Sequence, residues 1–250
     1  MLSPRGNSLK TLGLLGLAAL GMLGGCAAEQ GSADYIQQAL ASSERSPEMT
    51  ERDVARKPAE VLALSGIEPG DTVVEFAGFG QYYTTLLSSI VGPEGQVHMY
   101  DLPYTEERAG ENSRAFVAAH PNTTYNVVDY NAIELPSDVD VVYNVLYYHD
   151  LSLNDIDVAT LNRKIYDALK PGGVFLIIDH NAPAGTGTRD TESLHRIDPA
   201  VIKEEVLAAG FELAEDSDLL AHPEDDYSAM VFAPGTRGAT DRSLFKFVKP

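Results

Sequence analysis

Two histidines and two carboxylates end apolar runs in the second half of the chain, where they could transfer protons. The run "NVLYYHD" ends with His149 and Asp150, and the run "VFLIIDH" ends with Asp179 and His180. An imidazole titrates near neutral pH and can accept a proton from a reacting group. We predict that His149, Asp150 and His180 are catalytic, with Asp150 orienting His149. In the alternative, His149 only caps a turn.

The same side chains leave a metal site open as an alternative. Together with His195 they offer imidazole and carboxylate ligands, which zinc, manganese and iron accept. Their spacing matches no sharp metal-binding motif, so the predicted site contains no metal. The sequence has no Gly-x-Ser-x-Gly segment and a single cysteine, which gives no support to covalent hydrolase chemistry.

The polar segment after His180 is predicted to bind the substrate. The stretch "NAPAGTGTRDTESLHRIDP" combines a glycine- and threonine-rich loop with Arg189, His195 and Arg196. Tyr148 would add an aromatic wall. The two arginines would bind an anionic acceptor, unless they only balance nearby acids.

A glycine-containing turn lies earlier in the chain, in "VVEFAGFGQYYT" at residues 73–84. An apolar run ends in Glu75, passes through Ala77, Gly78 and Gly80, and enters a helix-like stretch. The N-terminal amides of such a helix can bind an anionic ligand group. We therefore predict that this turn contacts a cofactor.

The elements that position these residues alternate between strands and helices. Valine- and isoleucine-rich runs predict strands at Thr72–Phe76, Gln96–Tyr100, Thr124–Val128, Val139–Val145 and Val174–Asp179. Amphipathic stretches between them predict helices at Tyr82–Val91, Glu106–His120, Leu153–Leu169 and Pro199–Ala209. Two more strands are predicted at Phe211–Leu220 and Ser243–Val248, around a polar insertion at Ala221–Arg242. This order predicts a Rossmann-like α/β fold, with a mostly parallel seven-stranded sheet flanked by helices.

Ligands of such sheets bind at the carboxyl ends of the strands. Asp101 ends the second predicted strand, and Asp129 follows the third. A carboxylate in the first position can accept hydrogen bonds from ribose hydroxyls, and one in the second can meet an adenine amino group. In the alternative, each acid is only a helix cap or a loop residue.

The order of these motifs resembles the class I S-adenosylmethionine (SAM)-dependent methyltransferases. The resemblance rests on "VVE", "YD", "VVD" and "ALKPGGVFLIID" in succession, of which "LKPGG" is the most distinctive. The phrases "RDVARKP" and "YYHD" resemble a narrower group of predicted bacterial methyltransferases of undefined substrate. The similarity spans about residues 52–250.

The resemblance implies SAM as the cofactor and methyl transfer to a small-molecule acceptor as the activity. Glu75 and the turn at residues 77–81 would face the amino-acid moiety of SAM, and Asp101 would hold the ribose. Asp129 and Tyr130 would lie beside the adenine. Asn144 is also assigned to the cofactor.

The glycine turn departs from the family pattern of acid-x-Gly-x-Gly-x-Gly. Its three glycine positions hold Ala77, Phe79 and Gln81. The side chain of Phe79 stands where backbone should approach the ligand. The alternative function is therefore a catalytically altered, methyltransferase-like lipoprotein that binds another ligand or a metal.

Composition limits the partners of the chain. Its 250 residues carry a formal net charge of -19, which disfavours binding to nucleic acid. The length and the 44% hydrophobic content suit one domain with additions, predicted at residues 57–250. Residues 26–56 are predicted to be a tether with a short helical segment.

Residues 1–25 have the pattern of a bacterial lipoprotein signal peptide. A basic start and an apolar stretch precede "LGGC", whose Cys26 would be lipidated and become the first residue after cleavage. The expected location is membrane-anchored on the periplasmic side, and Ala27 favours the outer membrane. The alternative is an ordinary signal peptide with an incidental cysteine. No protein partner is predicted.

Overall fold

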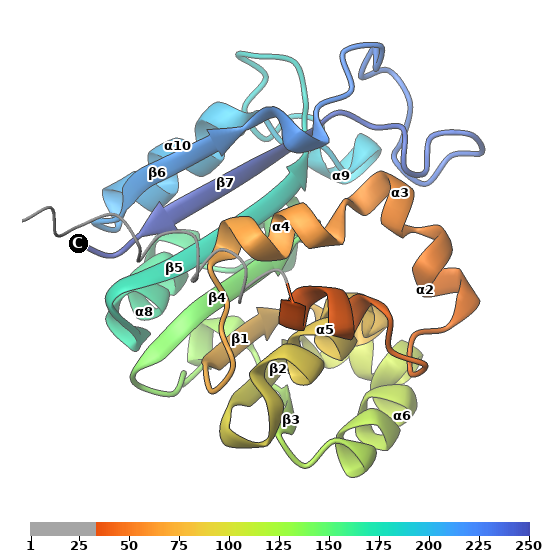
Figure 1. Cartoon of the computed structure of the whole chain (residues 1–250). Coiled ribbons are helices and arrows are strands. Elements are labelled where there is room, and N and C mark those ends of the chain that lie inside the picture. The colour runs from red at the N-terminus through yellow and green to blue at the C-terminus, as the bar shows by residue number, and fades with distance from the viewer. Residues whose placement is uncertain (1–33) are drawn as a thin grey trace, which may run out of the picture.

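The computed structural model describes residues 34–250 (Figure 1). The predicted signal peptide, the lipidation site Cys26 and the start of the tether lie outside the described residues. Between residues 34 and 250, no helix combines the length and the apolar character needed to cross a membrane.

One seven-stranded sheet organises the described chain, in the order β3-β2-β1-β4-β5-β7-β6. The first five strands in that order are parallel, and β7 runs antiparallel to β5 and β6. The strands are β1 (Thr72–Phe76), β2 (Gln96–Asp101), β3 (Thr123–Val127), β4 (Val139–Val145), β5 (Leu169–His180), β6 (Glu212–Ser217) and β7 (Arg242–Val248). The predicted fold class is confirmed.

Helices cover both faces of the sheet (Figure 1). Successive strand residues point to opposite faces, so Val73 packs with α4 (Pro58–Ser65) and α5 (Tyr82–Val91), whereas Val74 packs with α8 (Val158–Ala168) and α10 (Pro199–Ala208). The strands are apolar on both faces because both are buried. Further helices are α2 (Pro47–Glu51), α3 (Asp53–Arg56), α6 (Pro103–Ala119), α7 (Tyr148–Leu151) and α9 (Thr191–Leu194), and residues 34–40 are also helical.

Most predicted boundaries agree with the structure, and the differences have local causes. β1, β4 and α5 have the predicted bounds. α8 begins five residues late because residues 152–154 form a 3-10 helix and Asp155 adopts a left-handed conformation. β5 begins at Leu169, since the "LKPGG" residues form a bulge in the strand instead of a preceding turn.

Two further elements follow their sequence signals. Asp198 caps α10 and accepts a hydrogen bond from the Ala200 N–H at 3.0 Å, and Pro199 is the first residue of that helix. The polar stretch before β7 forms an irregular connection, which begins after a 3-10 helix at Asp218–Leu220. That connection and the helices α2 and α3 lie near the carboxyl ends of the parallel strands (Figure 1).

Candidate functional site

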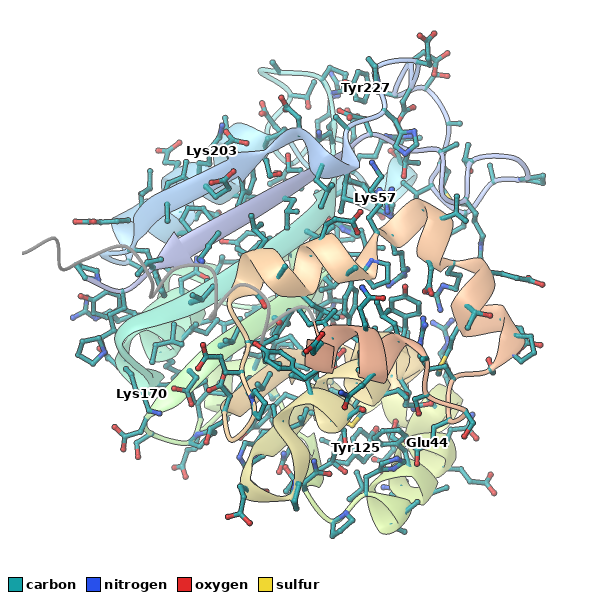
Figure 2. All side chains as sticks on the ribbon, viewed as in Figure 1. Glu44, Lys57, Tyr125, Lys170, Lys203 and Tyr227 are labelled. Atoms are coloured by element: carbon teal, nitrogen blue, oxygen red, sulfur yellow. The ribbon has the colours of Figure 1, made fainter. Side chains whose placement is uncertain are left out.

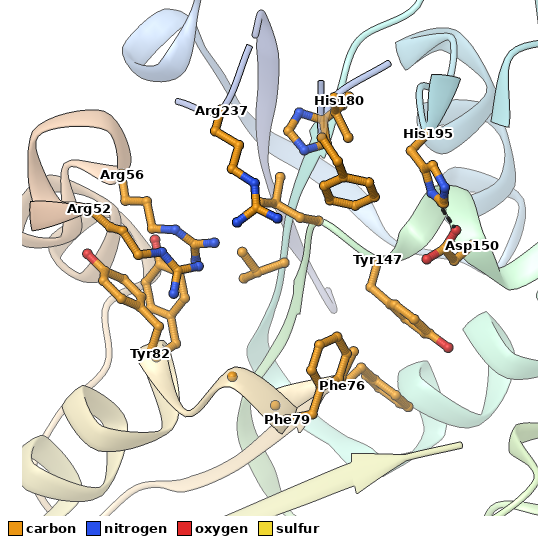
Figure 3. A pocket seen from close by; sticks show the side chains of 18 of the residues that line it. Arg52, Arg56, Phe76, Phe79, Tyr82, Tyr147, Asp150, His180, His195 and Arg237 are labelled. Atoms are coloured by element: carbon orange, nitrogen blue, oxygen red, sulfur yellow. Dashed lines mark ion pairs between the residues drawn. The ribbon is translucent and has the colours of Figure 1, made fainter. Parts of the chain in front are cut away.

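A cavity of about 600 Å³ lies at the carboxyl ends of β1, β4 and β5 (Figure 3). Its walls include Glu75 and Phe76 from β1, Val145 at the end of β4, and residues 146, 147, 149 and 150 that follow it. α2 and α3 contribute a second side, and residues 231–240 of the connection before β7 contribute a third. The volume falls within the range of about 300–1,000 Å³ that is usual for small-molecule sites.

The turn at residues 77–81 keeps the backbone shape that its missing glycines would favour. Ala77 (φ 56°) and Gln81 (φ 46°) both adopt left-handed conformations, at two of the three positions where the family pattern has glycine. Such conformations cost a non-glycine residue about 1–3 kcal/mol. Gly78 is needed for space, since a Cβ atom there would lie 2.9 Å from Glu75 Oε2.

Phe79 forms part of the cavity wall and does not fill the cavity. The residue remains 39% exposed, and its side chain lies beside Phe76 in Figure 3. The cavity of about 600 Å³ is present with this side chain in place. Phe79 therefore narrows the site while leaving room for a ligand.

Two buried carboxylates lie beside this turn. Glu75 is on the cavity wall, and its Oε2 accepts a hydrogen bond of 2.6 Å from the Thr84 hydroxyl. Burial raises the pKa of Glu75 to about 7. Asp101 is 0% exposed and lies behind the cavity lining, and neither of its carboxylate oxygens has a hydrogen-bond partner among residues 34–250. Burial raises the pKa of Asp101 to about 6, against the effect of the nearby Tyr125 hydroxyl.

The other residues assigned to the cofactor lie away from the cavity lining. Asp129 is exposed and accepts a hydrogen bond from the Asn131 N–H at 2.9 Å. Tyr130 is buried in the core and donates from its hydroxyl to the Tyr100 carbonyl at 2.6 Å. Asn144 is buried within β4. Asp129 and Tyr130 follow β3 as predicted, but their side chains have other partners. The Asn144 Oδ1 atom has no hydrogen-bond partner among residues 34–250.

A cluster of His149, Asp150 and His195 lies on the cavity wall. His149 Nε2 is 3.2 Å from His195 Nδ1 and 3.3 Å from Asp150 Oδ1. His195 Nδ1 is 3.2 Å from the same Asp150 oxygen, an ion pair drawn in Figure 3. The structure thus brings His195, which was predicted to bind the substrate, together with His149 and Asp150, which were predicted to be catalytic. These three atoms could together hold a metal ion.

Asp179, rather than Asp150, orients His149. Asp179 Oδ1 lies 2.7 Å from His149 Nδ1, and Oδ2 accepts the His149 backbone N–H at 2.7 Å. Burial opposes the charged form of His149, but Asp179 outweighs it, so the pKa of His149 lies above its ordinary value. The effect of His149 likewise outweighs burial at Asp179, whose pKa is lowered.

His180 lies on the cavity wall outside the three-residue cluster. Its Nδ1 is 2.9 Å from the Thr240 hydroxyl, and its ring centroid is 6.2 Å from that of His149. Burial lowers the pKa of His180 to about 3, so the imidazole is neutral at pH 7. It can therefore accept or donate a hydrogen bond, depending on its tautomer.

Three residues predicted to bind the substrate have partners elsewhere. The Tyr148 hydroxyl donates to Glu205 at 3.0 Å, Arg189 pairs with Asp190 at 2.7 Å, and Arg196 is fully buried. Arg196 binds Asp225 at 2.8 Å and also holds two backbone carbonyls. None of the three belongs to the cavity lining. Both arginines therefore match the alternative in which they balance local acids.

Other arginines line the cavity and were not assigned from the sequence. They are Arg52, Arg56, Arg108, Arg237 and Arg242. Of these, Arg52, Arg56 and Arg237 point toward the cavity in Figure 3. The guanidinium groups of Arg52 and Arg56 lie 5.0 and 4.6 Å from the ring centroid of Tyr82. Burial, followed by repulsion from Arg56, lowers the pKa of Arg52 to about 10.

This cluster of arginines contrasts with the formal net charge of -19 on the whole chain. Among the described ion pairs, none involves Arg52, Arg56 or Arg237. No lysine among residues 34–250 is part of the cavity lining. Lys170 and Lys203, for example, lie at the periphery of the molecule (Figure 2). The phrase "RDVARKP" was the available signal, but it falls in the segment predicted to precede the domain.

No protein-family model matches the chain. A ubiquinone/menaquinone biosynthesis C-methyltransferase, UbiE, of Teredinibacter turnerae is 28% identical over 123 residues, which are 49% of this chain and 48% of that protein. The chain thus matches about half the length of that relative.

Solved structures share the fold over more of the chain. A SAM-dependent methyltransferase from Aquifex aeolicus superposes with a TM-score of 0.58 at 18% identity, over 86% of this chain and 98% of that one. The [4+2]-cyclase SpnF superposes with a TM-score of 0.58 at 14% identity, over 90% of this chain and 95% of that one. The second match shows that this fold is not restricted to proteins named as methyltransferases. The chain has the fold of the SAM-dependent methyltransferases.

Proposed function

We propose that this protein transfers a methyl group from SAM to a small-molecule acceptor. The observation that carries the proposal is the pair of buried carboxylates, Glu75 and Asp101, at the ends of adjacent parallel strands beside a cavity. A buried carboxylate without partners is costly, so it indicates a ligand that supplies hydrogen-bond donors. The partial match to UbiE adds support.

Residues at and behind the cavity wall offer hydrogen-bond acceptors that suit the polar groups of SAM. Glu75 on the wall would accept hydrogen bonds from the ligand's ammonium group, and the unpartnered oxygens of Asp101 would accept them from ribose hydroxyls. Gly78 and Thr105 line the cavity in front of Asp101, so Asp101 would reach a ribose only if this part of the wall shifted. The left-handed Ala77 and Gln81 preserve the path of the turn around the ligand.

SAM supplies an activated methyl group: the acceptor bonds to the methyl carbon, the bond to sulfur breaks, and its electron pair stays on sulfur. The chain's task is mainly to align the acceptor and to exclude water. Tyr104 and Tyr147, whose hydroxyls lie 3.0 Å apart, provide a rigid aromatic side of the cavity. The cluster of His149, Asp150 and His195 is the place where an acceptor would lose its proton.

The arginines favour an anionic acceptor. Five guanidinium groups on one cavity exceed what the single carboxylate of SAM requires. Arg52, Arg56 and Arg237 have no ion-pair partner among the described residues, so an anion would gain charge-assisted hydrogen bonds from them. A carboxylate- or phosphate-bearing small molecule is the acceptor class that this charge supports.

Calorimetric titration of the full chain with SAM and with its demethylated product tests the function. Both ligands are expected to bind with micromolar affinity. Asp101→Asn should weaken binding, whereas Asp129→Asn should leave it unchanged, since Asp129 is exposed and bonds the Asn131 N–H. Absence of binding by either ligand at millimolar concentration would overturn the proposal.

We also propose that Cys26 anchors the protein to a membrane on the periplasmic side. The support is the sequence pattern of a basic start, an apolar stretch and "LGGC". Metabolic labelling with a tritiated fatty acid should mark the wild-type chain but not Cys26→Ser. Equal labelling of both would contradict lipidation at this cysteine.

A further inference from the structure

The three atoms of the histidine–aspartate cluster form a nearly equilateral triangle. Its sides are 3.2, 3.3 and 3.2 Å, between His149 Nε2, Asp150 Oδ1 and His195 Nδ1. In a tetrahedral zinc site with bonds of about 2.0 Å, two ligand atoms are about 3.3 Å apart. One ion just out of the plane of the triangle would therefore reach all three atoms at normal bond lengths.

Hydrogen bonds alone account poorly for this triangle. His149 Nδ1 lies 2.7 Å from the buried Asp179 carboxylate, which in the neutral imidazole assigns the proton to that side and leaves a lone pair on Nε2. This lone pair faces the Asp150 carboxylate, so two acceptors meet at 3.3 Å. In the neutral cluster, only His195 has a proton to share between them. A cation at the centre would satisfy all three atoms.

The surroundings of His149 match those of metal-binding histidines in general. Such histidines commonly donate their second N–H to a carboxylate, which fixes the ring and its tautomer. Asp179 is itself held in place, because it accepts backbone N–H groups of His149 and His180 at 2.7 and 2.8 Å. The lone pair of His149 is thereby aimed before any ion arrives.

The backbone also holds the cluster in an unusual conformation. Leu146, just before α7, and His195, just after α9, have φ values of 58° and 54°. Left-handed non-glycine residues of this kind gather at functional sites. Here they turn two separate segments, one carrying His149 and Asp150 and the other carrying His195. The three side chains of the cluster therefore meet at one point on the cavity wall.

We propose that His149, Asp150 and His195 bind a divalent transition-metal ion, with zinc as the ion whose geometry fits best. Two imidazoles and one carboxylate suit zinc or iron better than magnesium or calcium. All three residues line the cavity, so the fourth coordination position faces the space where the acceptor would bind. A role in binding an acceptor oxygen or sulfur rests on the proposed methyl transfer, but ion binding itself does not.

Zinc titration into the chelator-treated full chain, without SAM, tests the site. The wild type is expected to bind one ion per chain and to release protons on binding. His195→Ala should weaken zinc affinity at least 100-fold, and Asp150→Asn at least tenfold. His120→Ala is the matched control, because His120 pairs with Glu44 away from the cavity. Cobalt in place of zinc should give the visible absorption of a tetrahedral complex.

Circular dichroism establishes that each variant is folded, and His195 suits truncation because its side chain is 29% exposed. No zinc binding by the folded wild type, or equal binding by wild type and His195→Ala, would overturn the proposal. SAM titration of the metal-free protein separates the two ideas. If the metal-free protein does not bind SAM, the methyltransferase function is refuted and the result on metal binding still stands.

Discussion

Asp101 is the last residue of β2 and Asp179 is the last but one of β5, and both are fully buried, but their surroundings are opposite. Neither oxygen of Asp101 has a partner among the described residues. Both oxygens of Asp179 accept hydrogen bonds, from His149 and from the His180 backbone. Their pKa values move apart accordingly, upward to about 6 for Asp101 and downward for Asp179.

The contrast separates a carboxylate that holds the protein from one that is available to a ligand. Asp179 stabilises the fold and positions His149, so its interactions are complete without any other molecule. Asp101 is buried at a cost that the described protein does not offset. The predictions below test this difference, beginning with the largest expected effect.

Asp179→Asn should lower the free energy of unfolding by about 3–5 kcal/mol, because it breaks a buried, charged hydrogen-bond network. An amide offers one acceptor oxygen to three N–H groups and places its own N–H₂ against the others. Urea denaturation at pH 7.5 measures the change. A loss below about 1 kcal/mol would show that the network contributes little.

Asp101→Asn should instead raise the free energy of unfolding at pH 8, by up to about 3 kcal/mol for a pKa shift from 3.8 to about 6. The folded state binds this proton more tightly than the unfolded state, so wild-type stability falls as pH rises from about 4 to about 6. The difference between variant and wild type should therefore shrink toward pH 4. Equal stability at pH 8 would indicate that Asp101 bonds the Tyr125 hydroxyl in solution.

SAM affinity should rise roughly tenfold between pH 6 and pH 8, because the pKa of Glu75 is about 7 and its ionised form binds the ammonium group. Calorimetric titrations at the two pH values measure the effect. Glu75→Gln should bind SAM more weakly at pH 8 and should lose most of this pH dependence. A pH dependence that persists in the variant would assign it to another group.

The smallest effects are expected in the turn. Ala77→Gly should raise the free energy of unfolding by less than about 1 kcal/mol, because relief of the left-handed conformation is partly offset by the entropy of an unfolded glycine. Gly80→Ala should be equally mild, since no atom lies within 4 Å of its added Cβ. Thermal unfolding measures both. A large loss in Gly80→Ala would mean that the turn takes another path in solution.

The sequence predicted much of the fold because its signals are local. The apolar runs of β1 and β4 and the amphipathic stretch of α5 specify their own conformations, and their order specifies a parallel sheet. It also pointed to part of the cavity wall, since Glu75, His149 and His195 all lie there. Arg196 looked equally available in the sequence and is fully buried in an ion pair.

By itself, therefore, the sequence determined the fold class and the strand ends at which polar residues gather. Only the tertiary structure decided which of them have partners. Hydrogen bonds join residues far apart in the chain, such as His149 with Asp179 and Arg196 with Asp225, and they depend on side-chain directions that no local pattern encodes. For the same reason, the sequence did not identify Arg52 and Arg56 as cavity residues. Both reach the cavity from the helical segment that precedes the predicted domain.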